Sequence, residues 1–361
     1  MSRKLFFSDC HISAGLGLEP GGLDTHAWEW LTPSDQRRLA AFIAWVTSRA
    51  DEIDEVVLVG DIFDSWIFPH DIKPPTLFQI IASANATPLV QALDRLSRTI
   101  PTTILAGNHD IALSPAMLTL LLPKVTCPAN GIYSSGLLHA EHGHAWGLFN
   151  ASDPERQDNL PLGYFISRMV ATADRRSGSH TPSIAGEIKE IGELIATQEK
   201  LPQGVFDGVC AKAGVSEGDT ILMPDDLWDG EPTSVKEVRD IYKNLYHEWR
   251  TRNGTAGAVI AISAELNSLA IIADRIHITS GPRALIMGHT HEPVSQQITI
   301  PIIGNRVYVN AGAWCQRAEH AAWVEAEDRD GMVQLTVLGC TSFDSDGHPK
   351  GLTTLAGPVT A

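Results

Sequence analysis

Residues 55–64, EVVLVGDIFD, decide how this chain can fold. After Glu55 the next four residues are apolar, and three of them are β-branched, which is the pattern of a strand that is buried on both faces. Gly60 and Asp61 end the strand, and a second carboxylate, Asp64, follows three residues later. A polar cluster directly after a buried strand is typical of the site-bearing edge of an open α/β sheet.

The same pattern occurs on both sides of this stretch. The sequence predicts further buried strands at residues 4–8 and 102–106, and each is followed by Asp or Asn. Apolar residues at helical spacing over 32–49 and 89–97 predict two helices between the strands. Alternating strands and helices predict an α/β fold whose functional site lies at the carboxyl ends of the strands.

Residues 151–280 break this alternation, because helical periodicity dominates there. Apolar stripes over 184–195 and 235–249 each predict an amphipathic helix. We interpret the segment as a helical insertion that forms a cap over the expected site. Several aromatic residues, among them Trp30 and Trp66, are candidates for its rim, with ordinary core positions as the alternative. Its basic residues are expected on a solvated helix face, with binding of a second phosphate as the alternative: Arg168, Arg175 and Arg176.

The strand pattern returns after the insertion. A buried strand is predicted at 283–287, followed by one hairpin that turns at Gly304-Asn305 and another that turns at Asp330-Gly331. Gly, Pro, Thr and Ser are frequent after Ser342, which indicates a loosely attached segment. The predicted organisation is a core at residues 1–150 and 281–341, a helical insertion (cap) at 151–280, and a flexible C-terminal tail at 342–361.

The composition limits the function. The chain has 361 residues, with 27 Lys and Arg against 43 Asp and Glu, so its formal net charge is −16. Such a surface repels nucleic-acid backbones and anionic lipids. We therefore expect no membrane partner, and nucleic acid is disfavoured as a partner. The oligomeric state stays open.

The cysteines indicate the compartment. There are five, an odd number, and none forms a CxxC pair, which argues against a disulfide scaffold and for a reducing environment. The N-terminal residues lack the apolar stretch of a signal peptide, and the longest apolar run, eight residues, is far too short to span a membrane. The sequence therefore predicts a cytoplasmic protein.

Five short segments carry the candidate metal-ligating and catalytic residues. Each places Asp, Asn or His directly after a predicted strand. Carboxylate, carboxamide and imidazole groups together suit Mn²⁺, Fe or Zn²⁺, while the lack of a Cys cluster argues against a structural zinc site. The segments are Asp9 and His11 in SDCH, Asp61 and Asp64 in GDIFD, Asn108, His109 and Asp110 in GNHD, His142 and His144 in EHGH, and His289 and His291 in GHTH.

The order DxH, GDxxD, GNHD, H and GHxH resembles the signature of the calcineurin-like, binuclear metallophosphoesterases. The resemblance spans about residues 1–150 and 280–340 and leaves the insertion uncovered. It implies a β-sandwich flanked by helices in four layers (αββα) and two divalent metal ions, Mn²⁺ first, with Fe or Zn²⁺ as alternatives. The implied ligands are Asp9, His11 and His291 for one ion, Asn108, His142 and His289 for the other, and Asp61 as the bridge between both.

A two-metal site can hydrolyse phosphoesters by attack of a metal-bridging hydroxide on phosphorus, so no side-chain nucleophile is needed. The resemblance makes His109 the residue that protonates the leaving oxygen or contacts the phosphate. We expect Asp110 to accept the other N–H of that imidazole and Asp64 to lie just outside the ligands. His144 is open between a contact to substrate and an ordinary loop histidine. Cys10 lies between two expected ligands and is predicted to be a buried spacer rather than a thiolate ligand.

The finer resemblance is to the branch that contains the UDP-2,3-diacylglucosamine pyrophosphohydrolases, through GDIFDSW, GHTHEP and NAGAW. Several members of that branch carry Arg where His109 stands, so the lipid substrate is not carried over. Ser65 replaces the phosphate-gripping Arg of the protein Ser/Thr phosphatases, which disfavours that subgroup. We predict a phosphatase or phosphodiesterase of small phosphomonoesters or phosphodiesters. The alternatives are a pyrophosphohydrolase of a nucleotide-linked substrate, a non-catalytic binding scaffold and a nuclease.

Overall fold

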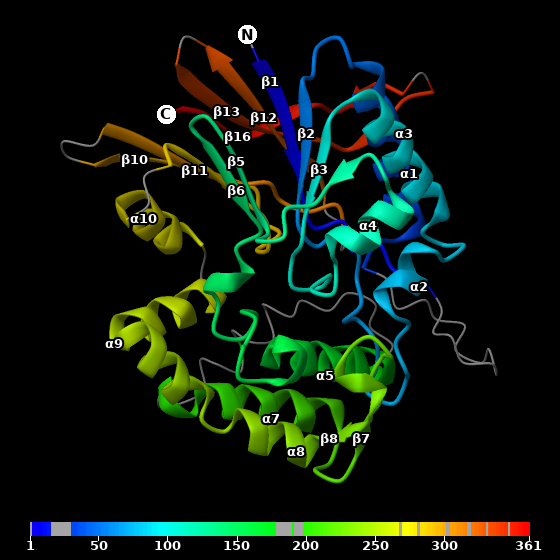
Figure 1. Cartoon of the computed structure of the whole chain (residues 1–361), viewed down its shortest axis with the longest axis vertical. Coiled ribbons are helices and arrows are strands. Elements are labelled where there is room, and N and C mark those ends of the chain that lie inside the picture. Colours follow the sequence, from blue (N-terminus) through cyan, green and yellow to red (C-terminus); the bar gives the residue numbers. More distant parts are fainter. Residues whose placement is uncertain are drawn as a thin grey trace.

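The core strands and helices that the sequence predicts are present in the computed structural model. It describes residues 2–15, 30–177, 190, 198–266, 269–279, 282–300, 304–315, 319–329, 331–345 and 347–361. Two large sheets lie in the upper half of Figure 1, and a group of helices lies below them. No helix within these ranges is both long and apolar enough to cross a lipid bilayer.

The larger sheet contains the predicted core strands side by side. β1 (Ser2–Phe7), β2 (Glu55–Val59) and β3 (Thr102–Leu105) pair in parallel. Alternate residues of β2 face two different apolar clusters, so both faces of the strand are buried and its unbroken apolar run is explained. The other strands of this sheet are β4 (Val125–Thr126), β12 (Ala321–Arg329), β13 (Met332–Cys340) and β16 (Thr353–Thr360).

The smaller sheet packs face to face with the larger one. Apolar residues from both sheets share one cluster, which includes Phe6 and Val57 of the larger sheet and Ile286 and Val307 of the smaller. This shared core makes the two sheets a sandwich. In sheet order, the strands of the smaller sheet are β10 (Val294–Ile300), β11 (Gly304–Asn310), β9 (Ala284–Met287), β6 (Leu138–Glu141) and β5 (Ile132–Ser135).

Helices cover the outer faces of the sandwich. α1 (Pro33–Ser48) and α3 (Thr87–Thr99) pack on the larger sheet, and α10 (Ala270–Thr279) packs on the smaller one. Thr32 caps α1 by accepting a hydrogen bond from the backbone N–H of Asp35. The order helix, sheet, sheet, helix confirms the predicted α/β fold in its four-layer form (Figure 1).

A second group of helices lies at the end of the sandwich where the predicted site is (Figure 1). These helices bury an apolar cluster of their own, which also takes in Trp66 from the loop after β2. Apart from residue 190, the stripe predicted at 184–195 lies outside the described residues. α10 falls within the predicted insertion but packs on the smaller sheet. The helices of the group are α5 (Leu162–Ser177), α7 (Leu201–Ala213), α8 (Val235–Tyr242) and α9 (Leu245–Leu266).

Short elements complete the chain. α2 and α4 lie beside the larger sheet in Figure 1, and β7 pairs with β8 among the lower helices. The short 3-10 helices lie in connecting loops. Their bounds are α2 (Leu77–Ile81), α4 (Pro115–Leu121), β7 (Thr220–Ile221), β8 (Thr233–Ser234), β14 (Ser342–Phe343), β15 (Pro349–Lys350), η1 (His144–Trp146), η2 (Gln157–Asn159), η3 (Gln198–Lys200) and η4 (Trp228–Gly230).

The turn of the first predicted hairpin was placed at the wrong residues. Gly304 and Asn305 lie in β11, opposite Ile300 and Thr299 of β10, and not in the turn between the two strands. The hairpin of β12 and β13 is confirmed, although Asp330 itself is not among the described residues.

The segment predicted as a flexible tail instead contains β16, which pairs antiparallel with β13 at the edge of the larger sheet. A strand that would otherwise leave its hydrogen-bonding groups exposed gains a partner in this way.

Arg168 of α5 joins the lower helices to the sandwich. Its side chain is fully buried and donates hydrogen bonds to the carbonyl oxygens of Phe68, Pro69, Ile72 and Leu222. It therefore lies neither on a solvated helix face nor at a second phosphate site, and both alternatives for this residue were wrong. The reason is that the loop after β2 presents several carbonyl groups with no strand or helix to pair them, and a buried guanidinium satisfies them together.

Replacement of Arg168 by Leu should destabilise the protein by about 3 kcal/mol or more, because buried carbonyl groups lose their donors. Chemical denaturation of the two proteins measures the difference. Arg175→Leu is the matched control on the same helix, since Arg175 pairs with the half-exposed Asp71 and such pairs contribute roughly 0–1 kcal/mol. An equal loss in both variants would contradict a special role for Arg168.

Candidate metal centre

Five loops that follow strand ends meet at one end of the sandwich. Three follow β1, β2 and β3 of the larger sheet, and two follow β6 and β9 of the smaller sheet. Parallel strands end at the same edge of a sheet, and the two sheets face each other, so residues far apart in sequence come together here. The predicted ligands on these loops are Asp9, His11, Asp61, Asn108, His142, His289 and His291, and all but the two histidines of the last loop are fully buried.

Two groups of ligand atoms share the carboxylate of Asp61. Within each group the atoms lie within 4.8 Å of one another. His291 lies beside the first group, with its Nε2 3.2 Å from Oδ1 of Asp9 and 3.2 Å from Nε2 of His11. The structure therefore brings these predicted ligands together, with Asp61 between the groups. The members are Asp9, His11 and Asp61 in one group, and Asp61, His142 and His289 in the other.

Two buried polar atoms in this centre have no hydrogen-bond partner among the described residues: Oδ1 of Asn108 and Nε2 of His142. Nδ1 of His142 donates to the carbonyl oxygen of Val59 at 2.8 Å, which fixes the ring, and its Nε2 faces the carboxylate of Asp61 at 3.0 Å. Buried polar atoms without partners are costly, and a cation beside them would satisfy both. With carboxylate, carboxamide and imidazole donors, the residues present fit divalent metal ions.

Five of the predicted ligands adopt the left-handed backbone conformation. The φ angle is positive at each, between 51° and 73°. This conformation is uncommon outside glycine, costs of order 1 kcal/mol or more for each residue, and clusters at functional sites where the surrounding fold enforces it. The strained residues are Asp9, His11, Asp61, His289 and His291.

Glycines in these motifs make room for ligands from other segments. A Cβ atom on Gly107 would lie 2.1 Å from Oδ1 of Asp61. A Cβ atom on Gly288 would lie 2.4 Å from Oδ2 of Asp9. Neither approach is possible without moving the carboxylate. The glycines of GNHD and GHTH are therefore required by the packing of the centre, and not only by the turns in which they lie.

Charges of opposite sign balance in the centre. Burial opposes the charge on Asp61, but the positive charges of His142 and His109 outweigh it and hold the pKa of Asp61 well below its usual range. Burial likewise opposes protonation of His142, but the charges of Asp61 and Asp9 raise the pKa of His142 to about 10. Burial and the charge of His142 lower the pKa of His289 well below the usual value. Without a cation, the centre therefore holds a proton on His142.

His109 is held by Asp64, and the prediction that Asp110 accepts its N–H was wrong. Nδ1 of His109 lies 3.2 Å from Oδ1 of Asp64, and Nδ1 of His11 lies 3.0 Å from Oδ2 of the same carboxylate. The carboxylate of Asp110 accepts from the backbone N–H groups of Gly107 and Ile62, at 2.6 and 2.9 Å. Adjacency in sequence suggested Asp110, but three backbone donors of two loops already use its oxygens.

Two aromatic residues enclose His109. Trp66 stacks on its imidazole with the ring centroids 4.6 Å apart, and Trp30 lies 5.3 Å away on ring centroids. Trp30 also contacts the ring of His11 at 4.7 Å. The sequence left these tryptophans open between rim and core, and the structure places both buried against residues of the site. The GDIFDSW motif, in which Trp66 follows Asp64 by two residues, was the available signal.

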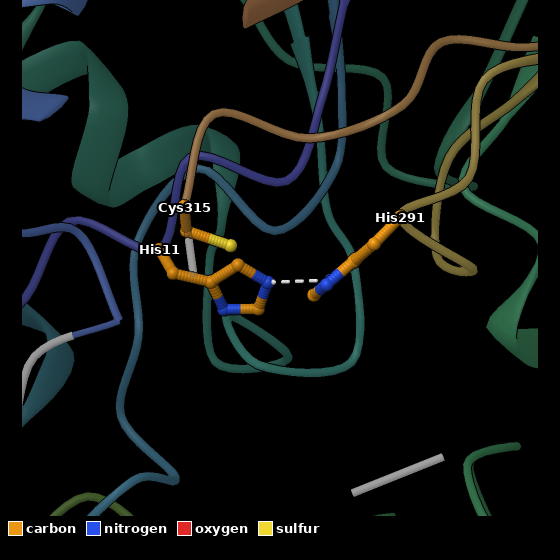
Figure 2. Close-up of side chains that lie close together, drawn as sticks. All are labelled: His11, His291 and Cys315. Atoms are coloured by element: carbon orange, nitrogen blue, oxygen red, sulfur yellow. Dashed lines mark hydrogen bonds between the residues drawn. The ribbon is translucent and has the colours of Figure 1, made fainter. Parts of the chain in front are cut away.

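The remaining candidates differ in position. The Cys10 thiol donates a weak hydrogen bond to the carbonyl of Ser8, 3.9 Å away, and Cys10 belongs to none of the ligand groups found among the described residues. His144 lies with its ring 5.4 Å from that of His142, and burial together with the charge of His142 lowers the pKa of His144 to about 3. Cys315, which the sequence did not single out, lies beside two predicted ligands (Figure 2).

The sandwich and its buried carboxylates and imidazoles define the class of protein, an α/β fold that can hold cations at the carboxyl ends of its strands. A family model of the calcineurin-like phosphoesterases matches residues 2–293, and the chain belongs to this family. Membership implies metal-dependent hydrolysis of phosphoesters, in agreement with the ligand groups. No curated protein matches the chain. The narrower resemblance to the UDP-2,3-diacylglucosamine pyrophosphohydrolase branch stays a prediction.

Metal affinity should rise with pH near neutrality. Ligation needs the neutral imidazole, whereas the pKa of His142 without a cation is about 10 and that of His289 is lowered, so one ion displaces one proton from His142. The dissociation constant for Mn²⁺ should therefore fall about tenfold for each pH unit between about pH 6.5 and 8.5. Electron paramagnetic resonance of free Mn²⁺ measures it, and a constant that does not change with pH would contradict the proton on His142.

Replacement of Gly288 by Ala should weaken metal binding by about 10–100-fold, the range seen when residues that orient ligands are lost. The new Cβ atom would meet Oδ2 of Asp9 at 2.4 Å and displace that carboxylate. Metal content after dialysis against chelator measures the effect. Gly218→Ala is the control, because a Cβ atom there has no atom within 4 Å and the φ angle is not positive. Equal metal content in both variants would contradict the packing argument.

Proposed function

We propose that this protein hydrolyses small phosphomonoesters or phosphodiesters with two divalent metal ions. The observation that carries the proposal is the position of Asp61, which belongs to both ligand groups while its Oδ1 accepts a hydrogen bond from the backbone N–H of His109. Two adjacent ions require a carboxylate that is shared in this way. The same carboxylate lies directly beside His109.

The ligands divide as the family resemblance implies. Asp9, His11 and His291 would hold one ion, Asn108, His142 and His289 would hold the other, and Asp61 would contact both. When bound, such ions would supply Lewis acidity, which can lower the pKa of a bound water to about 7 and neutralise charge on phosphoryl oxygens. We expect divalent ions of the Mn²⁺, Fe²⁺ and Zn²⁺ group, with Mn²⁺ the first expectation from the sequence.

His109 is the residue that we assign to protonation of the leaving oxygen. Its Nδ1 is engaged by Asp64, which leaves Nε2 as the nitrogen that can donate to substrate. Burial opposes protonation of this ring, but the charges of Asp64 and Asp61 outweigh it and raise the pKa of His109. The stacked Trp66 and the Asp64 hydrogen bond together fix the ring, so little reorganisation is needed before the proton is transferred.

The surroundings of the centre support a small substrate. His109 is only 5% exposed, and Trp66, which stacks on it, packs edge-on against Tyr164 of helix α5. Helix α5 of the lower group thus packs on the residue that covers His109. A folded protein or a DNA duplex needs an open surface, and a net charge of −16 adds repulsion against nucleic acid. The five unpaired cysteines support a reducing, cytoplasmic location.

The test is hydrolysis of p-nitrophenyl phosphate and bis-p-nitrophenyl phosphate by the Mn²⁺-loaded protein, together with elemental analysis. We expect about two ions per chain and turnover of at least one ester. His109→Ala should lose about 10²–10⁴-fold in rate and keep both ions, because the imidazole donates a proton and is not a ligand. His348→Ala, an exposed histidine near the C-terminus, is the control and should keep full rate.

The outcomes separate the alternatives. A preference for one ester distinguishes a phosphatase from a phosphodiesterase. The loaded protein could instead hydrolyse neither ester but turn over a nucleoside diphosphate linked to a sugar. That result would replace the proposal by the alternative function, a pyrophosphohydrolase. No bound metal and no hydrolysis would overturn the enzyme and favour a binding scaffold. Full activity of His109→Ala would remove His109 from the mechanism.

A further inference from the structure

Cys315 has the surroundings of a metal ligand. Its Sγ atom and one ring nitrogen each of His11 and His291 lie within 4.8 Å of one another. Nε2 of His11 and Nε2 of His291 are 3.2 Å apart, and Figure 2 shows Sγ of Cys315 directed toward this pair. Ligand atoms of one ion lie about 2.0–2.3 Å from it, which places them roughly 4.6 Å or less from one another. The three atoms are therefore near the spacing that a shared ion requires.

The backbone that carries Cys315 is fastened to the metal loops. The N–H of Trp314 donates to the carbonyl of Asp9 at 3.1 Å, and the N–H of Ala311 donates to the carbonyl of Met287 at 2.8 Å. The hydroxyl of Ser8 donates to the carbonyl of Gly312 at 3.2 Å. Residues 311–314 after β11 are thus tied to the loop after β1 and to the last residue of β9. These contacts hold the backbone next to Cys315 beside the loops that carry Asp9 and His289.

Cys10 provides an internal comparison. Both cysteines are buried in the same apolar cluster, and Cys10 is the immediate neighbour of His11 in sequence. The thiol of Cys10 nevertheless turns to the carbonyl of Ser8 and joins no ligand group among the described residues. Burial near the centre is therefore not enough to bring a thiol to the ligands. The position of Cys315 is specific.

We propose that Cys315 supplies a thiolate ligand to the ion held by Asp9, His11 and His291, and that this ligand makes the site select a borderline ion such as Zn²⁺ or Fe²⁺ over Mn²⁺. The inference rests on the metal centre of the proposed function. On binding, the S–H bond breaks, the proton leaves to solvent, and a sulfur–metal bond forms without any change of oxidation state.

The consequence is a centre with two unlike sites. Thiolate is a soft ligand that favours Zn²⁺ and iron, whereas carboxylate and carbonyl oxygens suit Mn²⁺ as well. Apart from the shared Asp61, the second ligand set contains only the carboxamide of Asn108 and the imidazoles of His142 and His289. Because the second site has only oxygen and nitrogen donors, Mn²⁺ can bind there. The sequence expectation of Mn²⁺ would then hold for one of the two sites.

Cobalt substitution tests the ligand directly. Co²⁺ bound by a thiolate shows a near-ultraviolet charge-transfer band that oxygen and nitrogen ligands do not produce. We expect the band in the unaltered full chain loaded with Co²⁺, its loss in Cys315→Ser with about two Co²⁺ ions still bound, and its retention in Cys10→Ser. Competition between Zn²⁺ and Mn²⁺ should show a Zn²⁺ preference that falls at least about tenfold in Cys315→Ser.

Each other outcome has a distinct meaning. Two Co²⁺ ions bound without the band in the unaltered chain would overturn the inference and leave the proposed function intact. Failure to bind Co²⁺, Zn²⁺ or Mn²⁺ at all would overturn the proposed function itself. A band lost in Cys10→Ser and kept in Cys315→Ser would assign the thiolate to Cys10. X-ray absorption of the unaltered chain with Zn²⁺ needs no variant, and the absence of a sulfur neighbour would overturn the inference even if Cys315→Ser does not fold.

Discussion

The carboxylate of Asp61 is the constraint on which the rest of this structure depends. It is buried, its backbone is left-handed with φ of 52°, and its carbonyl accepts from the N–H groups of both Cys10 and His11. Its side chain lies 3.0 Å from Nε2 of His142 and accepts from the backbone N–H of His109. A charged group in this position is tolerable only with positive charge close by. Protonated histidines supply that charge in part, and bound cations would supply it fully.

This constraint explains features that otherwise look unfavourable. Strained backbone at five predicted ligands costs stability, and glycine is needed wherever a second loop passes close to a ligand. The sandwich can sustain such a site because its strands are buried on both faces and hold the loop ends rigidly. The stable part of the molecule and the strained part are therefore physically separate. The first lies in the strand interiors, and the second lies at the strand ends.

The sequence predicted what depends on local pattern. Buried strands follow from unbroken apolar runs, and the residues at their ends follow from topology, so the gathering of Asp9, Asp61 and His142 could be foreseen. The choice of hydrogen-bond partner could not, because it depends on which loop lies opposite. Asp64 therefore contacts His109 in place of Asp110, the residue that the sequence suggested. The same limit applies to β16, because the frequent Gly, Pro, Thr and Ser residues of the segment after Ser342 gave no sign that an open edge of β13 needed a partner.

Arg168, in the lower helices, shows why a local sequence pattern can predict the wrong surroundings for a residue. A cation in an amphipathic helix is ordinarily solvated, but this one replaces secondary structure as the partner of the loop after β2. The same loop carries Trp66, which stacks on His109 and packs against Tyr164, one turn before Arg168 in α5. One helix thus both fastens the loop and supports the ring that stacks on His109. A change in how α5 packs would therefore reach, through Trp66, the residue that we propose as the acid.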